Sequence, residues 1–136
     1  MNTKGVRFLF TIIFSMLITF SCASFPHSEF EGTWFMNSGP NSADITIANT
    51  TEKSFEFLFE GIYPNEITGS ANMGDLEGTA FFTAGNKAVC VYSSEYLDDV
   101  TFEFAINGGK LLVSVVEGSE FGLFGLGVYM CGEYSK

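Results

Sequence analysis

The chain has 136 residues, of which sixteen are acidic and six are basic, and its formal net charge is −10. A surface this acidic repels phosphate backbones, so nucleic-acid binding is excluded as an expected function. The length suits one domain with a single hydrophobic core.

A basic start, an apolar run and a cysteine follow one another at the N-terminus. Lys4 and Arg7 precede residues 8–20, which are nearly all apolar, and Cys22 follows where a signal peptidase cuts bacterial lipoproteins. The apolar run is shorter than the ~20 residues that a membrane-spanning helix needs. We therefore predict lipidation of Cys22. A plain secretory signal cut elsewhere and an uncleaved membrane anchor are the alternatives.

This signal divides the chain into three parts. We predict a signal peptide over 1–21, a lipidated tether over 22–29 and one domain over 30–136. The tether would hold the domain in the bacterial cell envelope, at the outer membrane, on its periplasmic face or at the cell surface. From residue 22 onward the chain keeps four lysines, no arginine and all sixteen acidic residues, a formal charge of −12. Such a surface favours cationic partners, and a cationic protein such as lysozyme is the concrete candidate.

The rest of the chain consists of short runs with an apolar residue at every second position. Phe55, Phe57 and Phe59 alternate with Glu56 and other residues, which is the period of a strand with one buried face. The only helix expected is a single turn near 94–98. The expected strands are 32–37, 43–49, 53–60, 65–72, 76–84, 87–93, 99–107, 110–117 and 126–134.

Glycine and asparagine residues lie between these alternating runs. Asn107-Gly108-Gly109 and Gly85-Asn86 are typical of tight hairpins, so neighbouring strands should be antiparallel. We predict an all-β fold, a single antiparallel up-and-down β-barrel of eight or nine strands, with a β-sandwich as the alternative. Its interior is either a packed phenylalanine core or an apolar cavity.

The expected domain opens on Gly32-Thr33-Trp34, which resembles the Gly-x-Trp opening of lipocalins and related calycin barrels. The resemblance implies a lipocalin-like barrel, in which Gly32 bends the chain into the first strand and Trp34 closes one end. It also implies an alternative function, the carriage of a small apolar ligand in the interior. Lipocalins place a late arginine over this tryptophan, and no arginine follows residue 21 here.

The end of the chain carries a second resemblance. Residues 125–134 are similar to the ending of a group of small exported bacterial proteins that also begin with Gly-x-Trp. The resemblance implies an envelope location. We expect this segment to be the last strand and to close the barrel against the first.

Two cysteines remain after Cys22. In a compartment that permits disulfides, Cys90 and Cys131 form an even pair, and we predict that they are bonded. The alternative is two buried free thiols.

Two segments, 92–96 and 118–125, combine small polar residues or glycines with aromatic ones. Tyrosines among small polar residues are typical of recognition surfaces, and glycines with apolar residues in a loop suggest a contact with a partner. The alternative for the second segment is a lid folded over its own core. The candidate binding residues are Tyr92, Ser93, Ser94, Tyr96, Ser119, Phe121, Leu123 and Phe124.

The sequence shows no grouping typical of catalysis or of cofactor binding. The only histidine, His27, lies in the predicted tether, and the acidic cluster of Glu95, Asp98 and Asp99 lacks the spacing of a calcium loop. We predict no catalytic residue, no metal site and no cofactor. The expected function is that of a non-enzymatic binding module acting through exposed loops, with a ligand carrier or a structural envelope protein as alternatives.

Overall fold

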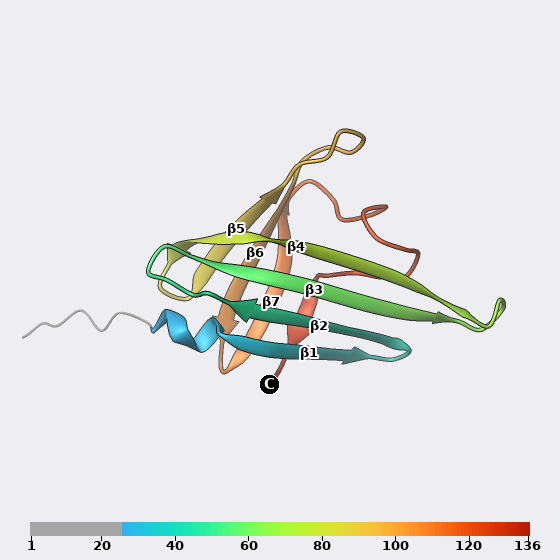
Figure 1. Cartoon of the computed structure of the whole chain (residues 1–136), viewed down its shortest axis with the longest axis horizontal. Coiled ribbons are helices and arrows are strands. Elements are labelled where there is room, and N and C mark those ends of the chain that lie inside the picture. The colour runs from blue at the N-terminus through green and yellow to red at the C-terminus, as the bar shows by residue number, and fades with distance from the viewer. Residues whose placement is uncertain (1–25) are drawn as a thin grey trace, which may run out of the picture.

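The structure, a computed structural model, describes residues 26–136 (Figure 1). A short 3-10 helix, η1 (His27–Phe30), precedes eight antiparallel strands that follow one another in chain order within one sheet. Cys22, residues 1–21 and the start of the predicted tether lie outside the described residues. Within residues 26–136, no helix has both the length and the apolar character needed to cross a membrane. The strands are β1 (Gly32–Ser38), β2 (Asn41–Ala48), β3 (Ser54–Asn65), β4 (Ser70–Ala84), β5 (Lys87–Tyr92), β6 (Val100–Asn107), β7 (Lys110–Glu117) and β8 (Gly132–Tyr134).

The first and last strands bring the two edges of the sheet together. Phe35 of β1 and Ser135, which follows β8, exchange two backbone hydrogen bonds of 2.8 and 3.0 Å. This bridge turns the up-and-down sheet into a nearly closed barrel. The prediction of a single antiparallel barrel is therefore confirmed, with eight strands rather than nine and without the sandwich alternative.

Aromatic side chains of the chain itself fill the barrel. On β3, Phe55, Phe57 and Phe59 point inward and are at most 3% exposed, as their alternation predicts. Phe104 of β6 contacts two of them, with ring centroids 5.5 Å from Phe55 and 4.8 Å from Phe57. Such tilted and edge-on pairs add stability beyond the apolar area that they bury. The interior is thus a packed core.

Three local predictions are wrong. The segment 65–72 is the tip of a long β3–β4 hairpin, where Gly69 N–H donates to the Asn65 carbonyl at 3.0 Å. Of the segment 126–134, only the last part is β8, and the expected helical turn near 94–98 consists of bends. The helix that does form, η1, begins inside the predicted tether and belongs to the folded domain.

Trp34 closes one end of the barrel from inside. Its side chain is 2% exposed, and its Nε1–H donates to the Phe30 carbonyl of η1 at 2.8 Å. Gly32, two residues earlier, has a φ of 116°, which favours glycine, so it allows the turn from η1 into β1. Both residues of the Gly-x-Trp motif therefore act where the motif predicts.

Lys136 lies over the same tryptophan from outside. Its Nζ is 4.4 Å from the Trp34 ring centroid, and it donates to the carbonyls of Glu29 and Glu31. A cation over an aromatic face is attracted by the negative charge of the π system. Lys136 thus joins η1 to the segment that follows β8.

Candidate functional site

The connections between strands gather at two ends of the barrel, because neighbouring strands run in opposite directions. One end, here called the η1 end, carries η1, the C-terminus and the connections after β2, β4 and β6 (Figure 1). The other, here called the loop end, carries the connections after β1, β3, β5 and β7. The connections 93–99 and 118–131, which hold the predicted binding residues from Ser93 to Phe124, therefore lie at the loop end.

Charge is distributed unequally between these ends. The turn after β2, the first residues of β5 and β7, and the C-terminus all lie at the η1 end, and they hold the four lysines of residues 26–136, Lys53, Lys87, Lys110 and Lys136. The loop end has no lysine or arginine. Its acidic residues are Glu66, Glu95, Asp98, Asp99, Glu117 and Glu120. The loop end therefore attracts cations more strongly than the opposite end.

The loop after β5 presents one fully exposed aromatic ring. Tyr96 is 90% exposed, and its backbone N–H donates to Ser94 Oγ at 3.2 Å. Ser94 is half-buried, so it shapes the turn beneath the tyrosine. Tyr92 is half-buried at the end of β5, and Ser93 is exposed beside it.

The loop 118–131 folds back over the mouth of the barrel. Phe124 packs against Phe59 with ring centroids 5.0 Å apart, and it also covers Gly74 of β4. Leu123 and Phe124 are half-buried and lie against the core. They therefore form a lid of the kind that was the alternative for this segment, and their role in binding stays a prediction.

Two aromatic residues of this second loop are exposed, Phe121 and Tyr129, and Phe121 is the more exposed of the two. Phe121 is 75% exposed, and its backbone N–H donates to Ser119 Oγ at 3.1 Å. Next to it, the Glu120 carboxylate turns inward and accepts from the backbone N–H groups of Met130 (2.9 Å) and Cys131 (3.3 Å). The lid is thus pinned from beneath while Phe121 remains available.

The predicted disulfide is corrected, since Cys90 and Cys131 are both free thiols. Cys90 lies on β5 and Cys131 immediately before β8, and the cross-strand register places Phe102 and Val115 between them. Three strand spacings of ~4.8 Å give a path of about 14 Å along the curved sheet. A disulfide needs Cα atoms within about 7 Å of each other.

Both thiols are held in their neutral form. Burial raises the pKa of Cys90 above its ordinary value. Burial, with the hydrogen bond and negative charge of Glu120, raises the pKa of Cys131 to about 12. Neither is therefore activated as a nucleophile, because the thiolate is the reactive form.

An open groove of about 520 Å³ lies on the outer face of β1–β4, and we call it the outer groove. Its lining includes four exposed large apolar side chains, of which Leu58 is the least exposed (39%). We call the other three the apolar rim: Phe35 (52% exposed), Ile62 (41%) and Met73 (69%). Sequence reasoning missed this site, because the outward-facing residues of β3 and β4 come together only through the register of the long hairpin.

Three carboxylates cross the outer groove in one line, and we call them the carboxylate row. Asp44 of β2 pairs with Glu60 of β3, which pairs with Asp75 of β4. Directly opposed side chains on adjacent strands have Cβ atoms about 4.5–5.5 Å apart, so these like charges repel. The ion pairs formed within residues 26–136 are Lys87–Glu103 (3.7 Å) and Lys110–Glu133 (2.9 Å), and neither includes a member of the row.

Removing the middle charge of the row should stabilise the fold. Glu60→Gln relieves two repulsive pairs, and we expect a gain of about 0.3–1 kcal/mol in the free energy of unfolding. The urea midpoint, measured at low salt and again at about 0.5 M salt, checks this, because salt should shrink the gain. Glu103→Gln is the control, since it removes an equal charge but breaks the pair with Lys87. A destabilised Glu60→Gln variant would contradict the repulsion.

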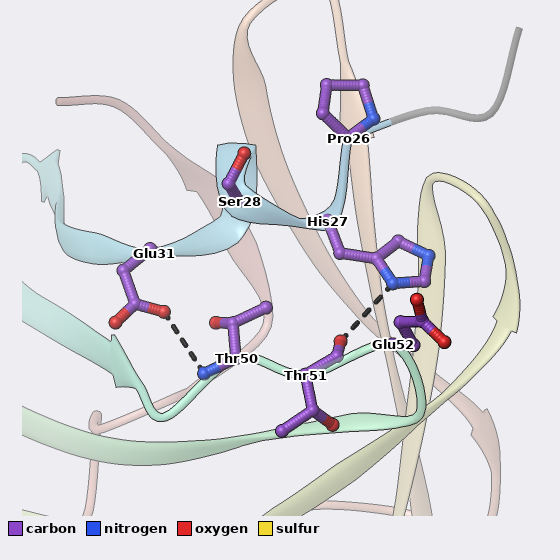
Figure 2. Close-up of a pocket in the computed structure, with 7 residues that line it drawn as sticks. All are labelled: Pro26, His27, Ser28, Glu31, Thr50, Thr51 and Glu52. Carbon is purple, nitrogen blue, oxygen red and sulfur yellow. Dashed lines mark hydrogen bonds between the residues drawn. The ribbon is translucent and has the colours of Figure 1, made fainter.

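A second open pocket, of about 750 Å³, lies where η1 meets the turn after β2 (Figure 2). His27 Nδ1 lies 3.3 Å from the Thr51 carbonyl oxygen, and the imidazole stacks on Phe82 with centroids 3.6 Å apart. The Glu31 carboxylate accepts from the Thr50 N–H at 3.2 Å. These contacts fasten η1 to the barrel. Within residues 26–136, no three His, Cys, Asp or Glu side chains group so as to hold a metal ion.

Comparison of the chain with protein-family models, curated proteins and solved structures gives no match. The eight-stranded, nearly closed antiparallel barrel is compatible with a lipocalin-like fold.

Proposed function

We propose that this chain is a lipid-anchored binding protein of the bacterial envelope, and that its loop end binds a cationic protein such as lysozyme without catalysing a reaction. The observation that carries the proposal is the segregation of charge. All four lysines of residues 26–136 lie at the η1 end, and the loop end carries carboxylates alone. A partner of opposite charge is steered to such an end, which raises the association rate.

The position of the N-terminus supports this orientation. The described chain begins at Pro26, next to η1 (Figure 1). An anchor at Cys22 would hold the η1 end closest to the membrane. The loop end would then face away from the bilayer, where a soluble protein can reach it.

The loop end also offers apolar contact area. Tyr96 and Phe121 are exposed aromatic residues on separate loops, and aromatic residues are frequent among those that dominate binding energy. The second loop is pinned to the core through Phe124 and Glu120. A pinned loop loses little conformational entropy on binding, which favours affinity.

The test compares two variants that lose the same charge at opposite ends. The loop triple, E95Q/D98N/D99N, should slow association of the full chain, purified in detergent, with lysozyme about tenfold at low salt. The η1-end triple, E29Q/E31Q/E52Q, should change the rate less than about twofold. Equal effects of the two triples, or no lysozyme binding by the unaltered chain at any salt concentration, would refute this partner class.

The anchor is tested separately. Intact-mass analysis of the chain made in a bacterial host should give an N-terminus at Cys22 that carries a lipid mass. A soluble product that still begins at Met1 would contradict the anchor. It would not affect the proposal that the loop end binds a cationic protein.

A further inference from the structure

The outer groove is an apolar hollow on a sheet face that no other segment of residues 26–136 covers. The apolar rim keeps 41–69% of each of its side chains in solvent. Large apolar groups gathered at one exposed place are typical of contact surfaces, whereas single exposed ones are ordinary. The groove lies on the outside of the β3–β4 hairpin, and the lid contacts the inside of the same hairpin at Gly74.

The charge of the groove identifies the chemistry of its occupant. The carboxylate row runs through the middle of the groove and has no cation beside it in the described part of the chain. Its two strand steps span about 10 Å. That is too wide for the coordination sphere of one ion, in which ligands lie at about 2.3–2.6 Å. Several positive charges on one connected molecule fit the row better.

We propose that the outer groove binds an extended segment of a cationic protein partner in which lysine or arginine residues alternate with apolar ones. The ammonium or guanidinium groups bind the carboxylate row, and the apolar residues pack on the apolar rim. The aliphatic stems of lysine and arginine also pack on apolar surface while their charged ends reach the carboxylates. The inference rests on the proposed function, since it adds a second contact with the same cationic partner, on the outer sheet face rather than at the loop end.

Binding of a cationic segment also explains why the protein keeps the carboxylate row, which is unfavourable in the free protein. Opposed carboxylates cost stability in the free protein, and a bound cationic segment removes that cost. Binding proteins commonly retain destabilising groups at the sites that they use. The bound segment supplies the positive charges that the row lacks, because the lysines of residues 26–136 all lie at the η1 end.

The experiment titrates the full chain in detergent with a short peptide of alternating lysine and leucine, followed by calorimetry. The groove triple, D44N/E60Q/D75N, should weaken binding at least about tenfold, and the loop triple less than about twofold. Met73→Ser, which removes apolar rim and no charge, should weaken binding several-fold. A peptide of alternating glutamate and leucine should not bind. All variants share the detergent, so peptide bound to micelles contributes equally to each.

Two outcomes separate this inference from the proposed function. If lysozyme binding depends on the loop triple while the peptide binds the groove triple and the unaltered chain equally, the groove inference is wrong and the proposed function stands. If lysozyme does not bind but the peptide distinguishes the groove triple, the groove is a cationic-segment site and the proposed partner is wrong. Circular dichroism should show the groove triple folded, because it relieves repulsion.

Discussion

Replacing Trp34 with alanine should remove a large part of the stability of the barrel. The side chain is 2% exposed, and truncating a buried tryptophan costs about 3–5 kcal/mol, against a total of about 5–15 kcal/mol for an ordinary domain. The change also deletes the Nε1 donor to the Phe30 carbonyl and the ring beneath Lys136. Trp34 is the only tryptophan, so the urea midpoint should be followed by far-ultraviolet circular dichroism, and a large decrease is expected.

Two companion variants divide this effect between packing and polar contacts. Trp34→Phe keeps an aromatic ring and loses the indole N–H, so its cost should be about 1–2 kcal/mol. Lys136→Met keeps an apolar stem and loses the cation over the ring with its bonds to two backbone carbonyls, for about 1 kcal/mol. An alanine variant that unfolds at the same urea concentration as the phenylalanine variant would contradict the closing role of this side chain.

The strands that could be predicted from sequence are those whose alternation is uninterrupted. On β3, Phe55, Phe57 and Phe59 are buried at every second position, and the pattern by itself gives the strand and its inward face. The turn at Asn107-Gly108-Gly109 was equally clear, because its two glycines have φ of 59° and 75°. Local chemistry determines both features.

The length of the β3–β4 hairpin and the extent of the lid could not be predicted, because each depends on the other. Gly61 and Gly74 occupy inward positions of β3 and β4 and interrupt the apolar alternation there. Val128 and Phe124 of the lid fill the spaces that these glycines leave. Alternation around Val128 therefore resembled a strand, although the segment is a loop whose apolar residues face glycines some 50 to 70 residues away.

Some residues of the candidate site could be predicted from local sequence, and others could not. Exposed aromatic residues such as Tyr96 and Phe121 were predicted from their loops, since loop composition is local. The carboxylate row required the β2–β3 and β3–β4 registers, and the absent disulfide required the order of β5 to β8 around the barrel. One feature of the sequence pointed to the role of Lys136, which is the only basic residue after Lys110.

Replacing Gly118 with alanine should be nearly as costly as losing a core side chain, although Gly118 is exposed. Its φ of 82° is in the left-handed region, which costs a residue with a Cβ about 1–2 kcal/mol. A Cβ here would also overlap the carbonyl oxygen of Asp99 and lie 3.2 Å from the Cα of Val100. Backbone cannot rotate away as a side chain does, and such overpacking costs about 1–3 kcal/mol more. We expect a total loss of about 2–5 kcal/mol in the free energy of unfolding.

Gly122→Ala is the matched control in the same loop. Gly122 has a φ of 83°, but a Cβ there would meet nothing within 4 Å, so this variant should lose only the conformational part, about 1–2 kcal/mol. The two variants also differ in their expected effect on binding, because Gly118 places the start of the loop 118–131 against Asp99 of the loop after β5, and an added methyl group must displace Asp99. Lysozyme binding, measured on folded protein at low temperature, should therefore fall with Gly118→Ala and persist with Gly122→Ala. Equal urea midpoints for the two variants would show that the contact with Asp99 yields freely, and the loop end would then be more adaptable than its packing implies.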